Sequence, residues 1–150
     1  MPKAAVVFHS QTGWTRKVGR LIARVLDAEA HEIESAPPDI ETYDLVVIGT
    51  PVHRCGPSRK VRNFLKGKTF QSLSFFCTYS LFGGISCLLT LNRLAQCRHL
   101  IHGLDVRFSP VEKWKKSQDD LSHKRERILE YVNFIEREIR RPSQEENGNR

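Results

Sequence analysis

The stretch VVFHSQTGWTRKVGRLI, at residues 6–22, decides the fold because a strand pattern in it passes directly into a helix pattern. An uninterrupted apolar run ends near Phe8 and predicts a buried strand over 4–9. Apolar residues then recur at helical spacing from Val18 to Leu26, which predicts a helix over 15–27 with one buried stripe. Between the two patterns lies a short loop of hydroxyl side chains around Gly13.

The same alternation continues along the chain. Further strands are predicted over 30–34, 44–49, 72–79 and 100–108, and further helices over 58–65, 85–97 and 117–141. Between 34 and 44 we expect a single turn or a plain loop in place of a crossover helix. In the helix over 85–97 we expect four partly buried residues: Ile85, Leu88, Leu89 and Leu91. Gly103 indicates a bulge or a close backbone approach.

These elements predict one α/β domain over 1–141, with a five-stranded parallel sheet and helices on both faces. Pro142 is expected to end the last helix and to leave a polar, disordered tail over 142–150. Ligands of such sheets bind beyond the carboxyl ends of the strands, where the strand order reverses. We therefore expect the site in three loops, at 9–15, 50–57 and 80–84.

Composition narrows the class of protein. The chain has 150 residues, of which 39% are hydrophobic and 27% charged, and its net charge is +7. We expect a globular cytoplasmic protein without a signal peptide or membrane span, and with its four cysteines reduced. No cysteine or histidine spacing matches a metal site. The basic residues are interspersed with acids, which disfavours nucleic acid as the partner.

The first loop has the features of a phosphate site. A helix N-terminus offers unpaired N–H groups and about half a unit of positive charge, and Ser10, Thr12 and Thr15 add hydroxyl donors. The alternative is that Ser10 and Thr12 merely cap the helix. No Walker-type lysine motif and no G-x-G-x-x-G fingerprint is present, and His9 and Thr50 stand where a receiver domain needs acidic residues.

Three stretches resemble the flavodoxin family. VVFHSQTGWT (6–15) resembles its phosphate loop, YDLVVIGTPVHRCGPSRKVRNFL (43–65) its third strand, first flavin loop and following helix, and FFCTYSLFGG (75–84) its fourth strand and second flavin loop. The resemblance implies a three-layer flavodoxin-like sandwich with strand order 2-1-3-4-5, in the short form, and FMN as the cofactor.

By position, the resemblance also implies which residues bind FMN. The 5′-phosphate would be wrapped by Ser10, Gln11, Thr12, Gly13, Trp14 and Thr15. The ribityl chain and one ring face would meet Thr50, Pro51, Val52 and His53, with Arg54, Cys55 and Gly56 near the ring edge. The other side would meet Tyr79, Ser80, Leu81, Phe82 and Gly83.

The chain departs from the family at three points. Trp14 stands where flavodoxins often have asparagine, residues 51–56 contain no tyrosine or tryptophan for stacking, and the chain is basic where many flavodoxins are acidic. We expect Phe82 or Tyr79 to supply the ring, His53 to be a candidate for proton supply, and the basic residues to favour two-electron chemistry.

Two classes of function remain open. In the first, the protein carries electrons or is an FMN-dependent oxidoreductase, acting on a quinone, a porphyrin-like molecule or a protein partner that is acidic, as a monomer or an oligomer. In the second, it is a flavin-free binding module whose basic surface meets nucleic acid or an acidic protein. The three matched loops favour the first class.

Overall fold

The computed structural model describes residues 3–108 and 122–148, and its first strand–helix unit follows the sequence closely. Strand β1 spans Ala4–Phe8 and helix α1 spans Trp14–Leu26, within a residue of both predictions. Val18 and Ile22 are fully buried on α1, so the predicted stripe is the face that packs on the sheet.

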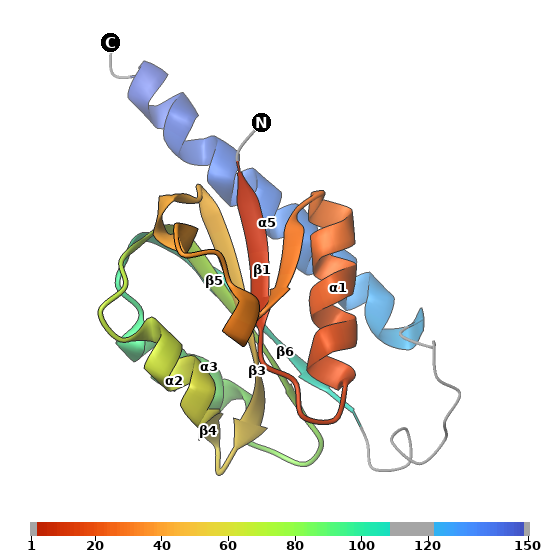
Figure 1. Cartoon of the computed structure of the whole chain (residues 1–150). Helices are drawn as coiled ribbons and strands as arrows, with labels where there is room; N and C mark the ends of the chain where they lie inside the picture. Colours follow the sequence, from red (N-terminus) through yellow and green to blue (C-terminus); the bar gives the residue numbers. More distant parts are fainter. Residues whose placement is uncertain (1–2, 109–121, 149–150) are drawn as a thin grey trace.

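The sheet has five parallel strands in the spatial order β2-β1-β3-β5-β6 (Figure 1). The other four strands are β2 (Glu29–Glu32), β3 (Leu45–His53), β5 (Phe70–Tyr79) and β6 (Cys97–Arg107). Counted among the parallel strands alone, this is the order 2-1-3-4-5 implied by the resemblance. The chain leaves β1 for one neighbour and returns by β3 on its other side, so the strand order reverses between β1 and β3.

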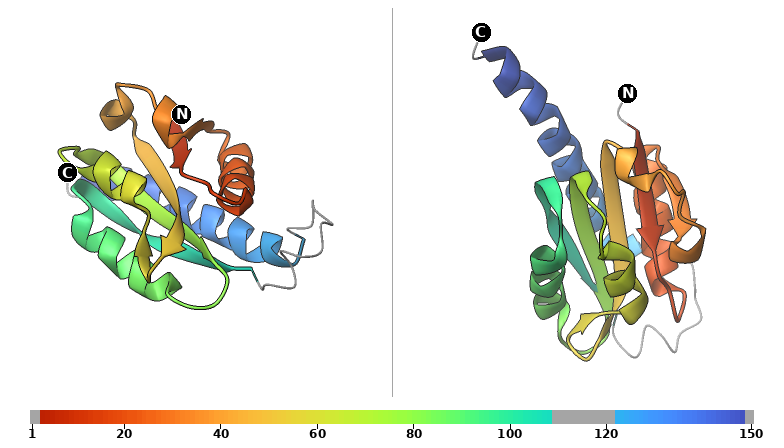
Figure 2. Two further views of the ribbon diagram at one scale, coloured as in Figure 1. Left: turned by 60° about the horizontal axis from the view of Figure 1, so that its bottom comes forward. Right: turned by 60° about the vertical axis from the view of Figure 1, so that its left-hand side comes forward.

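Helices cover both faces of the sheet and complete the three layers (Figure 2). Helices α1 and α5 (Ser122–Gly148) pack on one face, where Ile128, Val132 and Ile135 of α5 are buried. Helices α2 (Arg59–Leu65) and α3 (Gly84–Leu94) pack on the other face. The predicted residues 117–121 at the start of the last helix lie outside the described residues.

The predicted loop at 50–57 is wrong in part, because it contains a β-hairpin. Strand β3 continues to His53, and a two-residue strand β4 (Gly56–Pro57) pairs back on it in antiparallel fashion. Arg54 and Cys55 form the turn with φ of 47° and 62°, which is the double left-handed geometry of a type I′ turn. The usual Asn-Gly signal of such a turn is absent from the sequence.

Two element boundaries also differ from prediction. Residues 33–44 form two short 3₁₀ turns, Ile33–Ser35 and Ile40–Thr42, as the expectation of a turn allowed. Helix α5 continues past Pro142 to Gly148, so the prediction that Pro142 ends it is wrong. A proline removes one backbone hydrogen bond, and the bonds on either side can carry the helix onward. The division into a domain over 1–141 and a disordered tail over 142–150 stays a prediction.

Helix α3 turns a different face to the sheet from the one expected. Its buried residues are Gly84, Cys87 and Leu91, whereas Ile85 is 71% exposed and Leu89 is 53% exposed. Their predicted burial is therefore wrong. The cysteine and the glycine take the inner positions because the helix N-terminus approaches the sheet closely, and a Cβ on Gly84 would collide with the ring of Tyr79.

Over residues 3–108 and 122–148, none of the helices combines the length and the apolar character that crossing a membrane requires.

Candidate functional site

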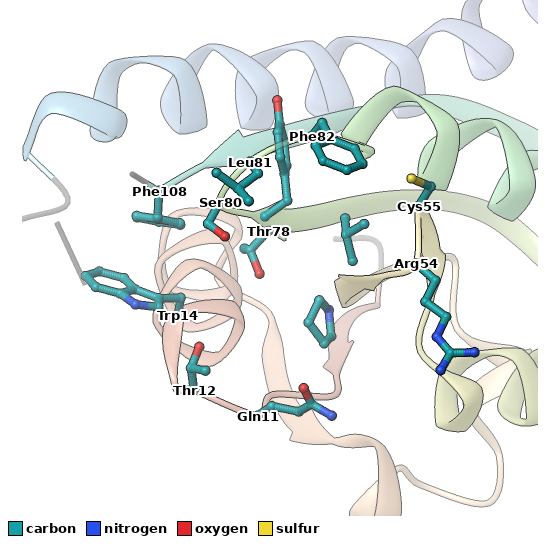
Figure 3. A pocket seen from close by; sticks show the side chains of 13 residues that line it. Gln11, Thr12, Trp14, Arg54, Cys55, Thr78, Ser80, Leu81, Phe82 and Phe108 are labelled. Atoms are coloured by element: carbon teal, nitrogen blue, oxygen red, sulfur yellow. The ribbon is translucent and has the colours of Figure 1, made fainter. Parts of the chain in front are cut away.

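The three predicted loops meet at the carboxyl edge of the sheet and enclose a pocket of about 280 Å³ (Figure 3). The first loop follows β1, the second is the β3–β4 hairpin, and the third joins β5 to α3. The lining residues that the sequence predicted are Gln11, Thr12, Trp14, Pro51, Val52, Arg54, Cys55, Tyr79, Ser80, Leu81 and Phe82. The structure thus brings together residues up to 71 positions apart in the chain.

Seven other predicted residues do not line this pocket: Ser10, Gly13, Thr15, Thr50, His53, Gly56 and Gly83. Most of them hold the loops in shape. Gly83 lies so close to the hairpin turn that a Cβ on it would be 3.0 Å from the Cα of Cys55. Thr50 Oγ1 accepts a hydrogen bond of 2.9 Å from the Ser58 N–H, across the base of the hairpin.

Helix α1 begins without a side-chain cap. Its N-cap residue is Gly13, with φ 94°, and no side chain accepts a hydrogen bond from its first turn. Ser10 Oγ instead accepts from the N–H of Gly13 itself, at 3.0 Å, and so shapes the loop before the helix. The alternative that Ser10 and Thr12 merely cap the helix does not describe this N-terminus. Among the described residues, no side chain caps the N–H groups of the first turn.

Thr15 has a partner inside the protein, and its implied contact with the phosphate stays a prediction. Its side chain is buried, and its hydroxyl lies 2.7 Å from that of Thr78 on β5. This buried hydroxyl pair fastens the start of α1 to the sheet. The Thr15 hydroxyl is therefore already paired inside the protein, whereas Thr12 is exposed and lines the pocket.

Two histidines tie the loops together at the edge of the site. His53 Nε2 lies 2.8 Å from Gln11 Oε1, which links the second loop to the first. His9 Nδ1 lies 2.9 Å from Ser58 Oγ, the N-cap of α2. Burial, and after it the nearby Lys60 charge, lowers the pKa of His9, so its ring is neutral at pH 7.

Aromatic side chains form opposite ends of the pocket (Figure 3). The rings of Trp14 and Phe108 are stacked, with centroids 4.4 Å apart, and join the first loop to the end of β6. Phe82, on the third loop, is 71% exposed. The Tyr79 hydroxyl donates to Asp105 Oδ2 at 2.9 Å, and burial followed by this bond raises the pKa of Tyr79. Among the described residues that line the pocket, Phe82 has the most exposed aromatic ring.

Sequence reasoning missed Thr78 and Phe108, which also line the pocket. Each lies at the carboxyl end of a predicted strand, and that position alone indicated that the residue could line a ligand site. Their side chains complete two contacts that start in the first loop, Thr15–Thr78 and Trp14–Phe108. The sequence did not show which residues of that loop face the sheet.

Comparison with known proteins agrees with this architecture. A family model described as a flavodoxin domain matches residues 5–81, which is just over half of the chain. The match includes the first two loops and the start of the third, up to Leu81. The chain therefore belongs to the flavodoxin domain family. A search of curated proteins finds no match.

Several solved structures share the fold. A flavoprotein in complex with FMN from Lactobacillus acidophilus is 20% identical, with 77% of this chain and 100% of that chain covered and a TM-score of 0.61. Oxidised flavodoxin 2 from Bacillus cereus is 14% identical, with 90% of this chain and 99% of that chain covered and a TM-score of 0.69. A WrbA-like flavodoxin from Agrobacterium tumefaciens is 22% identical, with 63% of this chain and 71% of that chain covered and a TM-score of 0.53.

Proposed function

We propose that this chain binds FMN in the pocket at the carboxyl edge of the sheet and acts as a redox protein. The observation that carries the proposal is the uncapped N-terminus of α1, which opens beside the pocket that the three loops enclose. Membership of the flavodoxin domain family and the FMN complex of the Lactobacillus acidophilus neighbour support it.

The residues present fit this cofactor. First-turn N–H groups of α1 and the Thr12 hydroxyl would hold the phosphate without a lysine, which suits a phosphate that is bound and never cleaved. Pro51 and Val52 offer an apolar wall, and Leu81 and Phe82 a second one across the pocket. When bound, FMN supplies the electron-transfer chemistry, and the protein orients it and sets its electrostatics.

The basic side chains near the pocket would influence the redox behaviour of the bound flavin. Arg54 lines the pocket, and the exposed His53 stands on the same hairpin. Cations at this edge would stabilise negative charge that develops on a reduced ring, which favours two-electron over one-electron chemistry. The electron donor or acceptor would be a small molecule, such as a quinone or a porphyrin-like ring, or a partner protein.

FMN binding is tested with Thr12→Glu, which places a negative charge at the expected phosphate position. The purified protein should absorb visible light as a flavoprotein, and titration into FMN should quench the flavin fluorescence. We expect Thr12→Glu to weaken FMN binding by at least about a hundredfold, because repulsion of a dianion is added to the lost hydroxyl contact.

The matched control is Gln96→Glu, which adds the same charge at an exposed position near the opposite end of β5. It should bind FMN as the parent does. If the parent neither retains FMN nor quenches its fluorescence, the proposal fails and the flavin-free binding module takes its place.

A further inference from the structure

A second hollow adjoins the pocket on the side of the hairpin and is strongly basic. It measures about 860 Å³ and shares two lining residues, Gln11 and Arg54, with the pocket. Its full lining is His9, Gln11, His53, Arg54, Pro57, Ser58, Arg59, Lys60 and Arg62, which we call the basic groove. The two hollows therefore form one continuous surface.

Among the described residues no carboxylate lines the basic groove, so the side chains that line it carry a net positive charge. Glu34 forms an ion pair with Lys60, so these two charges offset each other. Arg62 is partly fixed by the bond from its Nε to the Pro57 carbonyl. Arg54 and Arg59 are exposed and have no carboxylate partner among the side chains of residues 3–108 and 124–139.

The neutral groups of the groove also present donors. Ser58 Oγ accepts from the Val61 N–H at 3.4 Å and lies 2.9 Å from Nδ1 of the neutral His9. In either tautomer of His9 one donor of this pair is left over, the Nε2–H of His9 or the Ser58 hydroxyl. Gln11 Oε1 accepts from His53 Nε2, which leaves the Gln11 amide N–H groups as donors. A surface that presents cations and hydrogen-bond donors but no carboxylates favours the binding of oxyanions.

We propose that the basic groove binds the anionic end of a small organic substrate, one that carries a carboxylate, sulfonate or phosphate group, while the ring of that substrate reaches the rim of the adjoining pocket, beside the FMN that the pocket would hold. This inference rests on the proposed function, because it assigns a substrate class to the same site. The volume of the basic groove is within the range of ordinary ligand pockets, which suits a small molecule. Arg54 and Gln11, on the shared wall, would lie where the two parts of the substrate join.

The test compares two ligands with one ring system, anthraquinone-2-sulfonate and neutral 2-(hydroxymethyl)anthraquinone. Their binding to the purified, oxidised full-length protein is measured by isothermal titration calorimetry at low and at raised salt. We expect the sulfonate to bind at least about tenfold more tightly, and this preference to shrink with salt because exposed charges are screened.

Arg59→Glu locates the effect in the groove. Arg59 is the first residue of α2, where a negative side chain suits the helix dipole, so the variant is expected to fold. It should lower the affinity for the sulfonate about tenfold and leave that for the neutral ligand within about twofold. The control Arg24→Glu makes the same charge change in the last turn of α1, at the end of that helix away from the pocket, and should alter neither affinity.

The outcomes separate the two proposals. If FMN binds but the sulfonate shows no preference, or Arg59→Glu leaves its affinity unchanged, the inference is overturned while the proposed function stands. If the sulfonate binds with the expected Arg59 dependence and FMN does not bind, the proposed function fails and the anion site stands. Tighter binding of poly-L-glutamate or oligo(dT) than of the sulfonate, with the same Arg59 dependence, also overturns the inference, because it assigns the groove to a macromolecule.

Discussion

At the scale of single residues, the hairpin turn beside the pocket is the least relaxed part of the described backbone. Arg54 and Cys55 both occupy the left-handed region, which costs a residue with a Cβ about 1 kcal/mol or more. Glycine follows the turn, at Gly56, yet the left-handed angles fall on the two residues before it. The turn thus keeps a guanidinium and a thiol on the rim of the pocket where Asn-Gly would be more stable.

The double substitution Arg54→Asn/Cys55→Gly is therefore expected to stabilise the protein. Relief of two left-handed side chains should raise the free energy of unfolding by about 1 kcal/mol, after the greater chain entropy that glycine brings to the unfolded state is subtracted. Urea denaturation followed by circular dichroism measures it. Asp27 also has positive φ, and Asp27→Gly serves as a comparison at a helix C-terminus away from the site. A loss of stability in the double variant would show that the turn is not strained.

At the scale of elements, helix α5 is held to the sheet by a buried hydroxyl pair. Tyr131 Oη lies 2.5 Å from Ser74 Oγ on β5, and Ser74 donates onward to the His102 carbonyl of β6 at 3.3 Å. Burial raises the pKa of Tyr131, which keeps it a hydrogen-bond donor at any ordinary pH. One side chain of α5 thereby reaches two neighbouring strands.

Tyr131→Phe is expected to lower the free energy of unfolding by about 1 kcal/mol, the usual net value of a buried hydrogen bond. A double-mutant cycle with Ser74→Ala, measured by chemical denaturation, isolates the pair. We expect a coupling energy of about 1 kcal/mol between the two substitutions. Strict additivity would mean that apolar packing alone attaches the helix.

Much of the architecture at this scale was predictable, because each buried strand is a long apolar run. The sequence also identified Gly103 correctly: the register of β5 and β6 shifts beside it, and a Cβ there would lie 2.6 Å from the Phe75 carbonyl. Three features were not predictable from pattern alone. The hairpin lacks its usual turn residues, helix α3 buries a glycine and a cysteine in place of two of its larger residues, and Thr15 pairs with a hydroxyl 63 residues away.

The sequence predicted the location of the pocket more accurately than the contacts of the individual residues around it. Sheet topology fixes where three loops gather, and most residues that line the pocket were named on that basis. A shift of one residue along a loop changes which side chain faces the pocket, and local sequence patterns do not encode that shift. Thr15 and Thr78 illustrate this, as does Trp14, which turned out to stack on the last residue of the predicted fifth strand.

At the scale of the whole molecule, the neutral His9 couples stability to pH. Its folded pKa is lower than the ordinary value of 6.5, so below that pH the unfolded chain binds a proton that the folded chain resists. The free energy of unfolding should therefore fall as the pH drops from about 7 to about 5. The loss becomes complete only below the folded pKa.

The measurement is a series of urea unfolding curves between those pH values. His9→Asn, which keeps an acceptor for the Ser58 hydroxyl and cannot be protonated, should flatten the dependence. His102→Asn, at an exposed position, is the control and should leave it as it is. The pKa values of the Glu29 and Glu34 carboxyls are lowered from 4.5 by their hydrogen bonds, so the stability that these two groups contribute is lost in more acid solutions. An unchanged slope in His9→Asn would assign the acid sensitivity to another group.

The stack of Trp14 on Phe108 gives the protein an optical property of its own. The chain contains two tryptophans, Trp14 and Trp114, so replacing Trp114 by phenylalanine leaves a single indole, and that indole forms one wall of the pocket. Isoalloxazine absorbs where indole emits, so a flavin at contact distance would extinguish this emission by energy transfer. Trp14 is thus a native fluorophore that would reveal, without any label, whether the pocket is filled.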